Sequence, residues 1–518
     1  MQSKSALAGR AHSASRSQPR PERMASAEQS KKLHILLVPF FATSHIGPFT
    51  DLAVRLAAAR PGAVEPTVAV TPANVSVVRS ALERHGPAAG SLVKIASYPF
   101  PAVDGLAPGV ENLSAAGADG WRIDAAAMDE ALMRPAQEAL LREQAPDAVA
   151  SDIHFFWNSV VAEELGVPCV TFSVIGSFST LAMRHIGGAV TDGQEVAIPA
   201  PGLPTPEIRI PVTELPEFLR GPKAFNPRHA AVRRCFGLAK HTFLDLEQPY
   251  CEKLVRNGHV KRAYFVGPLS LPLPPAGAGA GESPCVTSLA SKPSCSVHRI
   301  DCMDWLDLKP AKSVVYLCFG SLTHVSQAQL RELALGLEAS GKPFLWVIRA
   351  DPWAPPEGWT ERVGDRGMVV TGWAPQTAIL AHPAVGAFVT HCGWNSVLET
   401  IVAGVPVLTW PMFFEQFITE RFVTEVLAIG ERLSPEGARV RSTRSEENEL
   451  VPAEAVAQAV TKFMEPGMAG EAARKRVQEL SAKAHAAVAE GGSSHRDLHR
   501  LIDDLMEARW ATAGTTLS

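Results

Sequence analysis

The chain has 518 residues, of which 46% are hydrophobic and 20% charged, and its formal net charge at pH 7 is −4. This length suits two domains, and the near-neutral charge gives no reason to expect a nucleic acid or an anionic membrane surface as partner. No apolar run is long enough to span a bilayer, and the eight cysteines show no C-x-x-C or zinc-like spacing, which favours free thiols in a reducing compartment.

The first residues differ in composition from the rest of the chain. Residues 1–23 are rich in Ser, Arg and Ala and nearly lack acidic residues. Either an organelle transit peptide or a disordered tail behind an upstream start codon has this composition. We favour a disordered extension over residues 1–30, a start near Met24 and a cytoplasmic protein, and we expect a monomer.

Strands and helices alternate over residues 31–270, which predicts a parallel sheet covered by helices on both faces. The strands are expected at 34–40, 65–72, 146–152, 167–173 and 263–269. A loop through His45 is expected to lead from the first strand to a helix starting near Phe49. A second helix is expected at 158–166.

Residues 271–300 are rich in Pro, Gly, Ala and Ser and are typical of an interdomain linker. A second alternating series fills 301–490, with strands expected at 313–321, 343–348, 368–373, 385–391 and 405–411. Its clearest helix, 326–341, has Ser326 as N-cap and Gln329 three residues later, which is a capping box. Residues 491–518 are expected to form a helix that packs back toward the first domain, followed by a tail.

Two open α/β domains joined by a linker predict a cleft between them. Ligands of such sheets bind beyond the carboxyl ends of the strands. Six side chains with useful chemistry follow expected strand ends, namely His45, Asp152, Ser321, Trp373, His391 and Glu415.

The stretch from Trp373 to Gln416 is the most informative part of the chain. VGAFVTH reads as a strand, HCGWNS as a turn and SVLETIVAG as a helix that ends at Gly404. Backbone N–H groups and the positive end of the dipole at such a helix start form an anion site that suits a diphosphate. His391, Asn395 and Ser396 can add side-chain donors. The flanking side chains offer a flat face for a base (Trp373) and acceptors for sugar hydroxyls (Glu399, Glu415, Gln416).

This stretch closely resembles the donor-binding signature of plant secondary-product UDP-glycosyltransferases, and the resemblance extends from about Leu33 to about Trp510. It implies a GT-B fold of two Rossmann-like domains facing across a cleft, with the acceptor bound by 31–270 and the UDP-sugar by 301–490. The implied donor contacts are Trp373 and Ala374 to uracil, Gln376 and Glu399 to ribose, Ser321, His391, Asn395 and Ser396 to the diphosphate, and Trp394, Glu415 and Gln416 to the sugar. Within the family a Gln at 416 accompanies glucose, and Trp394 stands where glucuronosyl-transferring relatives often have Arg.

His45 is our candidate for the general base, because an imidazole titrates near neutrality and can take a hydroxyl proton. Asp152 matches the family position that orients this imidazole, as in a catalytic His–Asp pair. Ser44 replaces the Gly that often precedes the base in the family, and His154 is a weaker candidate for the base. The resemblance implies direct displacement with inversion, and we find no D-x-D motif for a metal ion.

Two other readings of the sequence remain open. A sensor that binds a UDP-sugar without turnover would share the donor signature, although His45 and Asp152 argue for an enzyme. Transfer to carbon of a phenolic ring, giving a C-glucoside, is the alternative to transfer to a hydroxyl. The motif Gly336 to Lys342 resembles a P-loop, but Pro343 stands where Ser or Thr is required.

The sequence specifies the acceptor molecule less well than the donor. Aromatic residues near the expected strand ends, Phe40, Phe41, Phe155, Phe156 and Trp157, can wall a pocket or belong to the core. We select Phe41, Phe155 and Phe156 as acceptor-pocket candidates. Such walls suit a flat or lipophilic alcohol, for example a flavonoid, another phenol, a terpenoid or a hormone.

Overall fold

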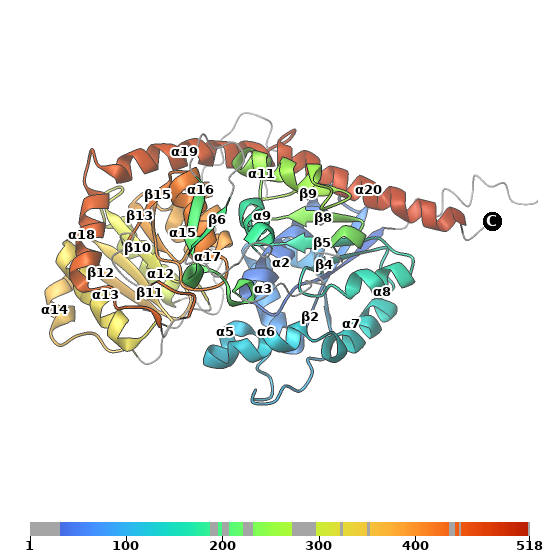
Figure 1. Ribbon diagram of the computed structural model, residues 1–518, viewed down its shortest axis with the longest axis horizontal. Coiled ribbons are helices and arrows are strands. Elements are labelled where there is room, and N and C mark those ends of the chain that lie inside the picture. Colours follow the sequence, from blue (N-terminus) through green and yellow to red (C-terminus); the bar gives the residue numbers. More distant parts are fainter. Residues whose placement is uncertain are drawn as a thin grey trace, which may run out of the picture.

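The computed structural model describes residues 32–186, 195–198, 207–220, 232–271, 297–321, 325–349, 353–434, 441–444 and 447–515. The predicted extension over residues 1–30 and most of the predicted linker therefore lie outside the described residues. Two α/β domains stand side by side, and two long helices at the C-terminus run along both of them (Figure 1).

The first domain is built on seven parallel strands. In spatial order they are β3 (Lys94–Ser97), β2 (Val64–Val70), β1 (Leu33–Val38), β4 (Ala148–Asp152), β5 (Cys169–Ser173), β8 (Gly237–Lys240) and β9 (Ala263–Phe265). The central strand β4 is buried along its whole length, as expected of a parallel sheet covered on both faces. Its helices are α2 (Thr43–Ala59), α3 (Val75–Glu83), α4 (Ala89–Leu92), α5 (Leu113–Ala116), α6 (Gly120–Met128), α7 (Glu130–Gln144), α8 (Asn158–Glu164), α9 (Ser177–Ile186) and α11 (Leu244–Arg256).

The second domain holds six parallel strands. Their spatial order is β12 (Gly367–Thr371), β11 (Phe344–Ile348), β10 (Val314–Cys318), β13 (Val385–Thr390), β14 (Val407–Thr409) and β15 (Gly430–Arg432). Its helices are α12 (Val297–Asp307), α13 (Gln327–Ser340), α14 (Trp359–Val363), α15 (Gln376–Ala381), α16 (Trp394–Ala403), α17 (Gln416–Arg421), α18 (Ala453–Met464) and α19 (Ala469–Val488), and the chain ends with α20 (Ser493–Thr515). The structure thus confirms the predicted fold class of two parallel-sheet α/β domains.

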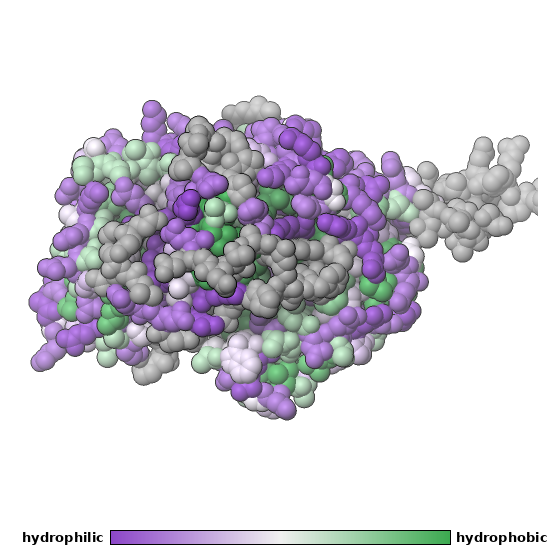
Figure 2. Space-filling view, viewed as in Figure 1, coloured by the Kyte–Doolittle hydropathy of each residue, from purple (hydrophilic) through white to green (hydrophobic). Residues whose placement is uncertain are grey.

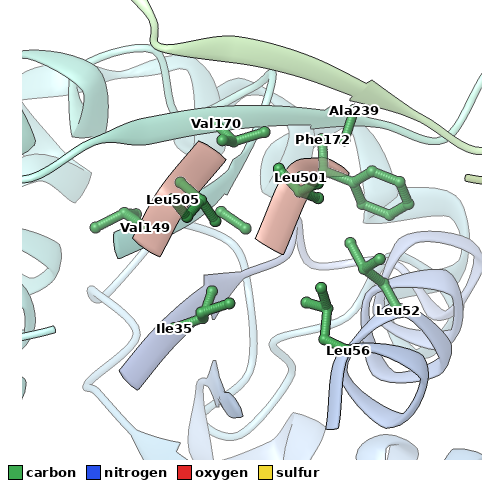
Figure 3. Close-up of a pocket in the computed structure, with 10 residues that line it drawn as sticks. Ile35, Leu52, Leu56, Val149, Val170, Phe172, Ala239, Leu501 and Leu505 are labelled. Carbon is green, nitrogen blue, oxygen red and sulfur yellow. The ribbon is translucent and has the colours of Figure 1, made fainter. Parts of the chain in front are cut away.

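The final helix α20 completes the core of the first domain. Its apolar residues Leu498, Leu501, Ile502 and Leu505 are buried in the same cluster as residues of β1, β5 and α2. Figure 3 shows Leu501 and Leu505 facing Ile35, Val170 and Phe172 across a small apolar cavity. The contact is fixed by polar groups at its rim, because the Tyr264 hydroxyl donates to Asp504 at 2.6 Å and the Phe265 N–H to Asp497 at 2.7 Å.

The two domains also pack directly against each other. The rings of Phe178 on α9 and Phe422, just after α17, are stacked with centroids 5.0 Å apart, and Ser179 bonds to Thr419 at 3.1 Å. Among the described residues no helix is long and apolar enough to cross a membrane. Among the residues coloured by hydropathy in Figure 2, hydrophilic side chains predominate.

Three details of the predicted elements are wrong. The helix expected near Phe49 begins at Thr43, so that His45 lies in its first turn and not in a loop. The capping box is only half formed, since Ser326 accepts from the Gln329 N–H but the Gln329 side chain bonds Val451 instead. The strands β3, β8 and β15 and the antiparallel pair β6 (Glu195–Ile198) and β7 (Ile208–Pro211) were not predicted.

Candidate active site

Asp152, the last residue of β4, lies between two imidazoles. Its Oδ2 is 2.7 Å from Nδ1 of His45, and its Oδ1 is 2.6 Å from Nδ1 of His154. The backbone N–H groups of Phe40 and His154 donate to the same two oxygens at 3.3 and 3.1 Å. Each carboxylate oxygen therefore accepts two hydrogen bonds, one from a ring and one from the backbone.

These contacts decide the charge and the tautomers at the site. Burial by itself would raise the pKa of Asp152, but His45 and His154 hold it well below its ordinary value. An ionised carboxylate only accepts, so the proton of each neutral ring lies on Nδ1. The Nε2 of His45 is then left with a lone pair, which is the state that a general base needs.

The same three residues are also a ligand set that a metal ion could use, since their ligand atoms lie within 4.8 Å of one another. A metal would have to displace hydrogen bonds that already occupy both oxygens of Asp152. The contacts therefore fit a proton-transfer pair better than a metal centre.

His45 is brought to the second domain by the first turn of α2. Pro48 in this helix has no N–H, so the carbonyl of Ser44 receives no bond from the residue four positions later. That carbonyl instead accepts from Nδ2 of Asn395 at the start of α16, at 2.7 Å. The residue before the candidate base is thus in direct contact with the predicted diphosphate loop.

His391 occupies the space left by two glycines on that loop and its neighbour. A Cβ at Gly320 would lie 2.7 Å from the ring, and one at Gly393 would lie 2.4 Å from Nε2. Burial, assisted by the charge of Arg349, lowers the pKa of His391 to about 4, so that the ring is neutral near pH 7. Its Nδ1 is buried and has no hydrogen-bond partner among the described residues.

Gln376 joins the predicted ribose and diphosphate groups. Its Nε2 donates to Glu399 at 2.7 Å and to Ser396 at 2.9 Å, while its Oε1 accepts from the Tyr316 hydroxyl at 3.3 Å. Burial raises the pKa of Glu399, against the effect of the bond from Gln376. These side chains, which come from β10, α15 and α16, hold one another in place.

Trp373 and Ala374 follow β12 at the edge of this cluster. The Trp373 side chain is 57% exposed, which leaves a flat aromatic face open to a ligand, whereas Ala374 is buried. The chain turns there through Gly372, whose φ of +94° favours glycine. Ser321 lies after β10, at the edge of the described residues, and is half-buried.

The predicted sugar-binding pair stands at the start of α17. The Oε1 of Gln416 accepts from the N–H groups of Met412 and Phe413 at 3.0 and 3.2 Å, which turns the amide nitrogen away from the loop. Burial raises the pKa of Glu415, and the charge of His45 opposes this rise. That electrostatic contact links a carboxyl group of the second domain with the candidate base of the first.

Trp394, predicted to contact the sugar, has another partner in this structure. Its side chain is buried, and its indole N–H donates to the carbonyl of His241 in the first domain at 2.6 Å. A Cβ at Gly176 would lie 2.9 Å from the Trp394 ring, so the close approach of the two domains requires glycine there.

Aromatic residues pack around the candidate base. Phe40 packs on both imidazoles, stacked on His154 at 4.2 Å and edge-on to His45 at 5.1 Å. The acceptor-pocket candidates Phe41 and Phe155 are 2% and 1% exposed and belong, together with Phe40, to one buried core cluster. Phe156 is half-buried at the margin of the same cluster.

Sequence reasoning did not find two residues that shape the site, Pro48 and His241. Pro48 could have been noticed, because a proline inside an expected helix frees a carbonyl. His241 carries no local signal, since its contact with residue 394 joins positions far apart in the chain.

Comparisons with known proteins point to the same kind of site. Residues 295–432 match the family described as UDP-glucoronosyl and UDP-glucosyl transferase. UDP-glycosyltransferase 73E1 of Stevia rebaudiana is 36% identical over 502 residues, covering 92% of this chain and 97% of the relative. The chain belongs to the UDP-glycosyltransferase family.

Two solved UDP-glycosyltransferases share its fold. Glycyrrhiza uralensis UGT73P12, complexed with glycyrrhetinic acid 3-O-monoglucuronide, has a TM-score of 0.78 and 29% identity, covering 94% of this chain and 98% of its own. Medicago truncatula UGT71G1, complexed with UDP-glucose, has a TM-score of 0.73 and 26% identity, covering 92% and 99%. The present UDP-glycosyltransferase is therefore an enzyme of the GT-B fold.

Proposed function

We propose that this UDP-glycosyltransferase transfers glucose from UDP-glucose to a hydroxyl group of a lipophilic small molecule and produces a β-glucoside. One observation carries the proposal. The His45–Asp152 pair is formed at 2.7 Å, and the carbonyl next to His45 is bonded to Asn395 of the anion loop. These contacts support a base and a diphosphate cradle that face each other across the domain boundary.

The donor lies on the second domain in this proposal. Trp373 stacks on uracil beside the backbone of Ala374, and Glu399, held by Gln376, accepts from the ribose hydroxyls. The diphosphate lies at the start of α16 with Ser321, His391, Asn395 and Ser396 as donors. Glu415 and the amide nitrogen of Gln416 bind the glucose hydroxyls. Glucose as the sugar is supported by the UDP-glucose complex of the Medicago neighbour.

The transfer step needs one proton acceptor and one leaving group. The Nε2 of His45 accepts the proton of the acceptor hydroxyl as its oxygen bonds to the anomeric carbon. The bond from that carbon to the diphosphate oxygen breaks, and UDP leaves with the electron pair. Attack opposite the leaving group inverts the α-linked donor. Asp152, which is ionised, stabilises the imidazolium that forms on His45.

Donors fixed before the reaction stabilise the departing diphosphate. The backbone N–H groups at the start of α16 and the side chains around them point toward developing charge and do not need to reorganise. We propose that the reaction requires no metal ion. Addition of a chelator to the assay is expected to leave the initial rate unchanged.

The acceptor binds on the first domain, above Phe40 and beside Phe156. Support for a lipophilic acceptor comes from these aromatic side chains and from the Glycyrrhiza neighbour, whose bound molecule is a glycyrrhetinic acid derivative. A panel of phenols, terpenoid alcohols and sterols incubated with UDP-glucose, read by mass spectrometry, identifies the class. Acid hydrolysis of the product distinguishes an O-glucoside from a C-glucoside, which survives.

Replacing the base tests the proposal. His45→Ala is expected to lower kcat by roughly 10²–10⁴-fold, because the hydroxyl loses its proton acceptor. The affinity for UDP, measured by calorimetry, should stay near the wild-type value, since donor groups lie on the other domain. His485→Ala, an exposed histidine on α19, is the matched control and should retain activity. A wild-type kcat in His45→Ala would remove His45 as the base.

A further inference from the structure

The diphosphate loop is held by the first domain through two consecutive side chains. Trp394 donates to the carbonyl of His241 at 2.6 Å, and Asn395 donates to the carbonyl of Ser44 at 2.7 Å. The first contact is fully buried and the second partly so. The orientation of the Asn395 amide therefore affects both the loop that binds the diphosphate and the helix turn that carries His45.

An amide can turn by half a rotation and exchange its oxygen for its nitrogen. With the opposite orientation, the Asn395 oxygen would face the carbonyl of Ser44, and two acceptors would repel each other. It would also present an acceptor to the acceptor oxygens of a diphosphate. The enzyme therefore requires a group that keeps the Asn395 oxygen on the other side.

The ring of His241 lies where such a group is needed. Its Nε2 accepts from the Leu269 N–H at 3.1 Å, so the proton of the neutral ring must be on Nδ1. Nδ1 of His241 and Oδ1 of Asn395 are both buried, and neither has a hydrogen-bond partner among the described residues. The amide of Asn395 is close enough to stabilise the protonated ring, although burial dominates and lowers the pKa of His241 to about 4. The ring is consequently a neutral donor at neutral pH.

The backbone is shaped to admit this ring. A Cβ at Gly267 would lie 3.0 Å from Cδ2 of His241 and 2.7 Å from the backbone nitrogen of Thr242. Pro48 completes the arrangement on the other side, because it leaves the Ser44 carbonyl without a helical donor. Four groups thus follow in order: the Leu269 N–H, the His241 ring, the Asn395 amide and the Ser44 carbonyl.

We propose that His241 is a positioning residue for glucosyl transfer, whose Nδ1–H holds the oxygen of Asn395 so that the amide N–H groups serve the Ser44 carbonyl and the donor diphosphate. One N–H fixes the spacing between the base and the diphosphate loop, and the other binds the leaving group. His241 contacts neither the reacting atoms nor the substrate. The inference rests on the proposed donor site.

A double-mutant cycle tests this chain of contacts. His241→Leu removes the donor, and we expect kcat/KM for UDP-glucose to fall roughly 10-fold to 100-fold, mainly through a higher donor KM, as for other losses of positioning. Asn395→Ala should cost at least as much. The double variant should have the same kcat/KM as Asn395→Ala alone, because the His241 side chain acts only through Asn395. His241→Asn keeps a donor near the position of Nδ1 and should recover part of the loss.

Pro48→Ala gives an independent measurement in a variant that is expected to fold. This substitution restores a helical N–H that competes for the Ser44 carbonyl, so kcat/KM should fall while thermal stability stays equal or rises. Wild-type kcat/KM in both His241→Leu and Pro48→Ala would overturn the proposal, and so would losses that multiply in the double variant. An inactive wild-type enzyme with UDP-glucose would instead contradict the proposed function.

Discussion

Gln376 donates to Glu399 at 2.7 Å within the proposed donor site. Glu399→Ala removes the proposed acceptor of the ribose hydroxyls and frees the Gln376 amide. A hydrogen bond to a charged group contributes about 1.5–3 kcal/mol, so we expect the donor KM to rise by roughly 10-fold to 100-fold with a smaller change in kcat. Glu399→Gln, which keeps an acceptor oxygen, should lie between Glu399→Ala and the wild type. A wild-type donor KM in Glu399→Ala would exclude the ribose role.

Gln416 offers a second prediction at the scale of single residues. Its Oε1 holds the loop through Met412 and Phe413, and its nitrogen faces away from that loop. A histidine cannot accept both backbone bonds and present the same donor. Gln416→His should therefore reduce the preference for UDP-glucose over UDP-galactose, measured by competition between the two donors. An unchanged preference would show that Gln416 does not select the sugar.

Side chains near strand ends could be selected from the sequence by their chemistry together with the family resemblance. His45 and Asp152 were predicted as a pair, and the ring of one meets the carboxylate of the other at 2.7 Å. The sequence could not predict which further residues a side chain contacts in the folded protein. His154 shares Asp152 with His45, and Trp394 bonds His241, because these contacts depend on how the two sheets stand relative to each other.

At the scale of elements, the sequence pattern located most strands of both sheets, but the ends of helices followed their tertiary contacts. The helix α13 illustrates the difference. Ser326 caps it as predicted, whereas both polar atoms of the Gln329 side chain bond the backbone of Val451 at 2.9 Å. A residue distant in sequence thus competed successfully with the local capping box. Short strands such as β3 and β15 have too few residues to show a period.

Gln329→Ala tests the role of this tertiary contact. The change leaves the N–H and the carbonyl of Val451 buried without a partner, and we expect the free energy of unfolding to fall by roughly 2 kcal/mol. Gln327→Ala, an exposed position two residues earlier on α13, is the matched control and should change stability by less than about 0.5 kcal/mol. Equal effects of the two substitutions in urea unfolding would show that the Val451 bonds add nothing.

At the scale of the whole molecule, the alternating pattern predicted two facing domains, and the contacts between them supply what the pattern lacked. Phe178 and Phe422 stack across the boundary, and α20 returns to bury its apolar face against the first sheet. Both contacts join segments that are far apart in the sequence. Packing at this boundary also leaves His241 of the first domain only 2% exposed.

The burial of His241 predicts how the stability of the molecule depends on pH. Its pKa is lowered to about 4 by burial, while the neighbouring charges act in opposite senses: Asp51 raises the pKa and Arg55 lowers it. In the unfolded chain a histidine titrates near 6.5. As the pH falls from about 6.5 to 4, the unfolded chain binds a proton that the folded protein does not bind. Folding therefore loses stability over this range, by about 3 kcal/mol at pH 4 for His241 alone.

Asp152 cannot cause a loss in the same range. Its pKa is held below the ordinary value near 3.8, so its stabilising contribution is present above that value and decreases only at lower pH. Urea unfolding at pH 6.5, 5.5 and 4.5 should show the loss in the wild type and a clearly smaller loss in His241→Asn, which does not titrate. His391, whose pKa is also lowered to about 4, should account for part of the remainder. The same pH dependence in both proteins would mean that His241 is protonated in the folded state.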